Sequence, residues 1–172
     1  MKNTKKLTLS GIFLALGIIL PFFTMQIPEI GSMLLPMHIP VLLCGFLCGW
    51  QYGLAVGLIV PLLRSLMFGM PPIIPAVAMT PELACYGAAA GVLYALLKNK
   101  KLSEYIALIG AMVSGRIVWG FASLATYNFL LNQSFTWKIF VGGAFLQAIP
   151  GIIVQMVLIP PIVMLLKKKH IV

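Results

Sequence analysis

Long apolar runs separated by small basic clusters constrain this chain more than any other feature of its sequence. Hydrophobic residues make up 61% of the 172 positions and charged residues only 9%, whereas a soluble domain carries about 25% charged residues. A helix needs about 20 mostly apolar residues to cross the hydrocarbon core of a bilayer. The sequence therefore predicts an all-α polytopic membrane protein and excludes a soluble globular domain.

The lysines predict how the chain is oriented in the membrane. Nine of the ten lysines fall in three clusters, at residues 2–6, 98–101 and 167–169. Basic segments beside membrane spans remain in the cytoplasm, so the chain must cross an even number of times between successive clusters. We expect a multi-pass protein of the plasma membrane with both termini in the cytoplasm. The lysines thereby account for most of the +9 net charge without a nucleic-acid partner.

Hydropathy and turn residues divide the chain into six predicted spans, which form a single membrane domain over residues 1–172. As one helix, residues 36–69 would extend for about 50 Å against a hydrocarbon core of about 30 Å. Gly49 and Gly53 permit a tight reversal within this stretch, and splitting it there keeps the number of crossings even. The predicted transmembrane helices are residues 7–25, 36–49, 53–68, 76–97, 105–131 and 139–166.

The sequence lacks the motifs that would define several other functions. It contains no Gly-x-x-x-x-Gly-Lys-Ser/Thr loop for ATP phosphates, so we do not expect the chain to hydrolyse ATP. It also contains neither His-Glu-x-x-His nor a serine nucleophile motif, and its three cysteines do not have metal-ligand spacing. We therefore expect no enzymatic activity, no cofactor and no metal site.

Polar side chains inside the predicted spans are the candidate binding groups, because ionisable residues there face protein or water rather than lipid. Five of them, each from a different span, are expected to converge on the outer half of the bundle. They are His38, Arg64, Glu82, Asn128 and Gln147. This pattern predicts a site for a small polar solute that approaches from outside.

Structural roles remain open for several of these polar residues. Arg64 and Glu82 could neutralise each other as a structural pair, and His38 could cap the start of its helix. Arg116, halfway along the fifth span, and Gln155 in the sixth could each be structural or face a ligand.

Small residues form two further patterns. Gly11 and Ala15 place two small side chains on one face of the first span, near its cytoplasmic end, where a partner protein could dock. A second set recurs at intervals of four around the predicted reversal and indicates close packing of helices inside the protein. It comprises Gly45, Gly49, Gly53 and Gly57.

Three stretches carry a resemblance to a known family. They are Ser10-Gly11-Ile12-Phe13-Leu14-Ala15, the run Leu35-Pro36-Met37-His38-Ile39-Pro40 continuing to Gly45, and Pro61-Leu62-Leu63-Arg64-Ser65 continuing to Pro71. Together with six spans in so short a chain, they resemble the substrate-binding subunit, or S component, of energy-coupling-factor (ECF) transporters. The resemblance covers essentially the whole chain.

This resemblance implies a function in vitamin uptake. S components bind a vitamin from outside and deliver it when docked on a transmembrane coupling protein that two cytoplasmic ATPases drive. Gly11 and Ala15 match the spacing of the family's Ala-x-x-x-Ala docking pattern. The stretch from Met37 to Pro72 is similar to pantothenate-type members, in which case Arg64 would bind the carboxylate.

Two alternatives remain open at this stage. Glu82 could instead select a cationic vitamin precursor, with Arg64 as its partner. The chain could also be a solitary ion-coupled secondary carrier of a small polar solute. Such carriers often have inverted repeats and a buried acid for the coupling ion, but the two halves here share no evident repeat, and Glu82 is the only acid deep in a predicted span.

Overall fold

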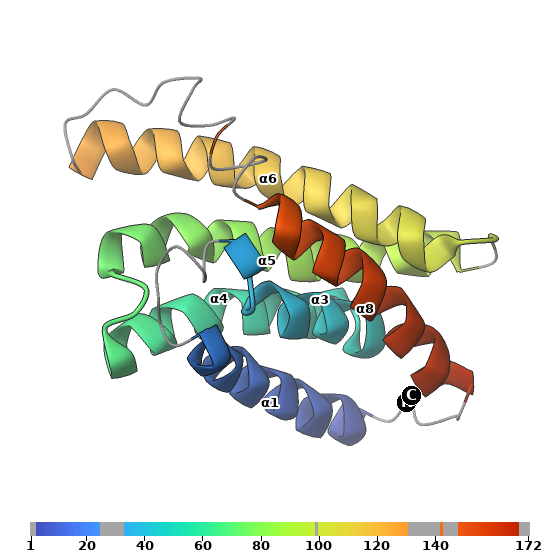
Figure 1. The fold of residues 1–172 in the computed structure, drawn as a ribbon. Coiled ribbons are helices and arrows are strands. Elements are labelled where there is room, and N and C mark those ends of the chain that lie inside the picture. The colour runs from blue at the N-terminus through green and yellow to red at the C-terminus, as the bar shows by residue number, and fades with distance from the viewer. Residues whose placement is uncertain (1–2, 25–32, 99, 131–141, 143–147, 169–172) are drawn as a thin grey trace.

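The computed structural model describes residues 3–24, 33–98, 100–130, 142 and 148–168, and these residues form helices and connections without any strand. The helices pack side by side in one bundle (Figure 1). They are α1 (Asn3–Ile19), α3 (His38–Cys48), α4 (Trp50–Phe68), α5 (Ile73–Leu97), α6 (Ser103–Leu130) and α8 (Ile149–Lys168), with a short 3-10 helix η1 (Leu20–Thr24) after α1. The predicted all-α fold is confirmed.

Five of these helices are long and apolar enough to cross a membrane, and α3 is the exception. Its 11 residues extend for only about 16 Å, about half of a hydrocarbon core. The helix begins at His38 rather than at residue 36 because the chain turns at Pro36 and Met37, after Leu35 at a positive φ of 51°. The start of the last predicted span, at residues 139–147, lies outside the described residues apart from residue 142.

The described lysines of the three clusters share one end of the bundle. The start of α1, the end of α8 and the α5–α6 connection lie at this end, and the α4–α5 connection lies at the other (Figure 1). The Nζ atom of Lys167 lies 3.7 Å from the ring centre of Tyr94, whose hydroxyl donates a 3.2 Å hydrogen bond to Glu104. These contacts join α8, α5 and α6 at what we call the lysine end. The predicted grouping of the basic clusters is therefore confirmed.

Side chains exposed on the long helices are largely apolar, as a lipid environment requires. Each long helix contributes some of them. Examples are Leu7, Leu66, Leu96, Phe121 and Val157, each of which is at least 64% exposed. A water-soluble monomer rarely exposes so much apolar surface, so the outer face supports the membrane assignment.

Glycines bring the backbones of α3, α4 and α5 into contact. A Cβ atom added at Gly53 would lie 2.5 Å from the carbonyl oxygen of Gly87 and 2.8 Å from the Cα of Gly45, and one at Gly57 would collide with the carbonyl of Leu83. The predicted internal packing role is confirmed for Gly45, Gly53 and Gly57. Gly49 instead forms the turn between α3 and α4, with a φ of 100° that favours glycine.

Candidate functional site

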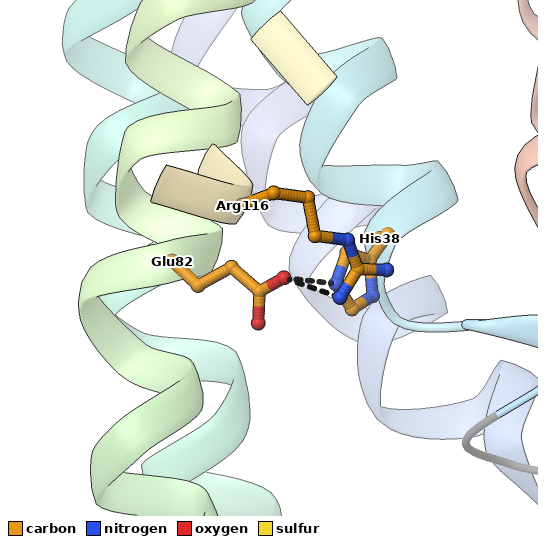
Figure 2. Close-up of polar contacts among 3 residues, drawn as sticks. All are labelled: His38, Glu82 and Arg116. Carbon is orange, nitrogen blue, oxygen red and sulfur yellow. Dashed lines mark ion pairs between the residues drawn. The ribbon is translucent and has the colours of Figure 1, made fainter. Parts of the chain in front are cut away.

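Three ionisable side chains meet in the interior of the bundle. The Oε1 atom of Glu82 lies 3.0 Å from Nη1 of Arg116 and 3.6 Å from Nε2 of His38. Figure 2 shows the guanidinium and the imidazole both facing this one carboxylate oxygen. The exposed fractions of His38, Glu82 and Arg116 are only 1%, 1% and 6%. Three different helices thus contribute to one buried polar cluster.

The helices place this cluster close to the midpoint of the bundle, with Glu82 in the half of α5 that lies away from the lysine end. Glu82 lies nine residues after the first residue of α5, about 14 Å along the helix axis. Arg116 is the fourteenth of the 28 residues of α6. His38 reaches the same depth because α3 is short and its first residue is already inside the protein.

Tyr86 completes the wall of the cluster beside His38. Its ring contacts the imidazole edge to face, with 5.1 Å between the ring centres. The Tyr86 ring also packs against the backbone at Gly115, where an added Cβ would lie 2.9 Å from ring atoms. Tyr86 was not among the predicted site residues. Its position four residues after Glu82, and thus on the same helix face, was the signal for it.

Several polar atoms at these buried positions have no hydrogen-bond partner among the described residues. They are Nδ1 and Nε2 of His38, Oε1 of Glu82, Nε and Nη2 of Arg116, and Nε2 of Gln155 on α8. Glu82 Oε1 and Arg116 Nη1 form an ion pair, but their geometry is not that of a hydrogen bond. Leaving a buried polar group unpaired costs about 1–3 kcal/mol, so native proteins do it rarely and usually at functional positions. Arg116 and Gln155 therefore join the candidate binding groups.

Arg64 is engaged elsewhere. Its Nη1 donates a hydrogen bond to the carbonyl oxygen of Ile18, near the end of α1. Its guanidinium carbon lies 4.7 Å from the ring centre of Phe22 and 5.7 Å from that of Phe68. The partner of Glu82 is thus Arg116, and the alternative pairing of Arg64 with Glu82 is not what the structure shows.

The remaining predicted residues lie apart from the cluster or outside the described residues. Asn128 is exposed near the end of α6, and Gln147 belongs to the segment that the structure does not describe. Gly11 and Ala15 are both exposed on α1, and an added Cβ at Gly11 would have no atom within 4 Å.

An apolar helical bundle with ionisable groups at its centre defines a class of protein: a polytopic membrane protein whose interior holds a polar cluster. Residues 5–163 match the family model of the substrate-specific component of ECF transporters. The chain therefore belongs to this family, and the resemblance seen in the sequence is confirmed at that level. No curated protein and no solved structure matches the chain significantly.

Proposed function

We propose that this chain is the micronutrient-binding subunit of an ATP-driven uptake transporter in the plasma membrane, with pantothenate as its substrate. Family membership supports the role of substrate-specific subunit. In this proposal the lysine end faces the cytoplasm, as the positive-inside tendency predicts. The substrate reaches the buried cluster from the opposite side of the membrane.

The unpartnered polar atoms of the buried cluster are the observation that carries this proposal. His38, Glu82, Arg116 and Gln155 hold polar atoms in the interior of an apolar bundle that no described residue satisfies with a hydrogen bond, and a polar ligand or water can satisfy them. Asn128 and Gln147 remain predicted contacts without such support, and the proposal gives Arg64, which donates to the Ile18 carbonyl, a structural role.

Pantothenate fits the chemistry of these side chains. It is small, and it carries one carboxylate, one amide and two hydroxyl groups. Arg116 can pair with a carboxylate, while His38 and Gln155 offer groups that can donate to, or accept from, hydroxyl and amide groups.

The proposed partners are a transmembrane coupling protein and two cytoplasmic ATPases. The chain has no ATP-binding loop of its own, which agrees with a division of labour between subunits. Gly11 and Ala15 form a small, exposed patch on α1 that we propose as the docking contact with the coupling protein.

The pairing of Glu82 argues against the solitary ion-coupled carrier. Such a carrier commonly needs a buried acid that is free to take up and release the coupling ion. Glu82 is the acid in the interior of the described bundle, and it is held 3.0 Å from the guanidinium of Arg116.

Uptake of radiolabelled pantothenate into cells tests the proposal. We expect accumulation when the chain is produced with the coupling protein and both ATPases, and none when the phosphate-binding lysines of the ATPases are substituted. Accumulation by the chain alone, abolished by collapsing the ion gradient, would instead establish the solitary carrier.

A further inference from the structure

Among the described residues, the guanidinium of Arg116 makes its ion pair through one of its three nitrogens. Nη1 lies 3.0 Å from the Glu82 carboxylate. Nε and Nη2 are both buried and have no hydrogen-bond partner among the described residues. These two atoms belong to the same edge of the guanidinium plane, and their N–H bonds point in nearly parallel directions. Arg116 thus offers a pair of parallel N–H donors in the interior of the protein.

A carboxylate is the group that matches this edge. Its two oxygens have the spacing of the two N–H donors, and arginine binds carboxylates and phosphates in this fork-to-fork manner. The single contact with Glu82 leaves the edge intact, so the two carboxylates can share one guanidinium without competing for the same donors.

The charges of the cluster favour one carboxylate over a phosphate. Arg116 and Glu82 neutralise each other, so a bound carboxylate adds a single negative charge. The His38 imidazole, 3.6 Å from Glu82, lies beside this pair and can form a hydrogen bond with a bound ligand. A phosphate group would bring a charge of nearly two into the same buried space, which is far more costly.

We infer that the substrate is a monocarboxylate whose carboxylate binds side-on to Nε and Nη2 of Arg116 while Glu82 remains on Nη1. The inference rests on the proposed function, because it concerns the ligand of the same site. It assigns to Arg116 the recognition that the sequence suggested for Arg64, which is bonded to the Ile18 carbonyl at the end of α1.

Titration of the purified natural protein with six vitamins tests the ligand class. Pantothenate, biotin and nicotinate carry a carboxylate, whereas thiamine, riboflavin and pyridoxine do not. We expect binding of a carboxylate-bearing probe, and at least a tenfold weaker affinity for its analogue with an alcohol or amide in place of the carboxylate. Pantothenol and nicotinamide are such analogues.

The outcomes separate the inference from the proposed function. Binding only of thiamine, riboflavin or pyridoxine would overturn the carboxylate inference and the choice of pantothenate, and would leave the role of micronutrient-binding subunit standing. Equal affinity for a carboxylate and its uncharged analogue would overturn the carboxylate inference alone. If folded protein bound none of the six vitamins, the proposed function itself would fail.

Arginine variants then test the assignment to Arg116. Arg116→Lys keeps the charge but removes the fork, so the affinity ratio of carboxylate to analogue should fall to about one. Arg64→Lys is the matched change at the other buried arginine, and the ratio of the natural protein should persist. The opposite result in either variant overturns the assignment. Binding of the uncharged analogue shows that each variant is folded, and Arg116→Gln serves as a second variant if Arg116→Lys does not fold.

Discussion

Atom Nη1 of Arg116 lies 3.0 Å from Oε1 of Glu82, and this ion pair joins α6 to α5 in the interior of the bundle. Buried charges are tolerated when each has a partner, so the pair explains how two ionisable groups persist at the centre of an apolar protein. Since the ion pair uses Nη1, the Nε and Nη2 atoms of Arg116 can still donate hydrogen bonds to a further anion.

Removing the charge of Glu82 distinguishes an anionic from a cationic ligand. In Glu82→Gln, we expect the affinity for a carboxylate ligand to rise several-fold, because the repulsion between two nearby negative charges is lost. A cationic ligand would bind more weakly to the same variant. Calorimetric titration measures both effects, with Glu104→Gln as the control because it removes the same charge at the lysine end. Weaker carboxylate binding by folded Glu82→Gln would contradict the account.

Gly115 controls the position of Tyr86 and, through it, that of His38. In Gly115→Ala, the new methyl group would lie 2.9 Å from the Tyr86 ring, so the ring must move away and disturb its contact with the imidazole. We expect ligand affinity to fall about three- to tenfold, by analogy with the cost of overpacking. Gly110→Ala on the same helix meets only the end of the flexible Leu93 side chain, and it should leave affinity unchanged. Equal affinities in the two variants would remove Tyr86 from the site.

Gly53 maintains the close contact of α3, α4 and α5. In Gly53→Ala, the added methyl group meets backbone atoms of Gly87 and Gly45 that cannot rotate away. We expect a loss of about 1–3 kcal/mol in the free energy of unfolding, seen as a lower melting temperature in detergent. Gly11→Ala is the control, since its methyl group meets no atom and alanine favours the helix by about 1 kcal/mol. A Gly53→Ala protein as stable as Gly11→Ala would refute the packing role.

The exposed face of α1 can be tested separately from the binding site. We expect Gly11→Leu and Ala15→Leu to abolish ATP-dependent uptake, because a large side chain prevents another helix from approaching closely. Ligand binding by the purified variants should be unchanged. Ile12→Leu, at an exposed neighbouring position of similar size, is the control. Normal uptake by both leucine variants would rule out docking through this patch.

Much of the fold can be predicted from the hydropathy and the charge distribution of the sequence. Apolar runs of sufficient length predict helices, and the lysine clusters predict which helix ends lie together. The length of α3 was harder to predict. Hydropathy alone does not show that the chain turns at Pro36 and Met37, so that the helix begins only at His38. Because α3 begins there, His38 lies at the depth of Glu82.

The site was predicted in part, and the omissions have a physical cause. His38 and Glu82 were identified as ionisable groups within spans, but Arg116 was left undecided because α6 is apolar on all sides and its sequence does not show which face is inward. For Arg64, the sequence near the end of α1 indicates the observed contact. Pro21, three residues after Ile18, has no backbone N–H to donate to the Ile18 carbonyl in a 3-10 turn, and Arg64 donates to that carbonyl instead.

Mass spectrometry of the small molecules released from purified protein tests directly whether Arg116 holds a micronutrient with a carboxylate. The natural protein and Arg116→Lys are purified side by side, denatured, and their extracts compared. The account predicts about one carboxylate-bearing micronutrient per natural chain and a strongly reduced amount from Arg116→Lys. Equal amounts from both proteins, or a retained ligand without a carboxylate, would contradict it.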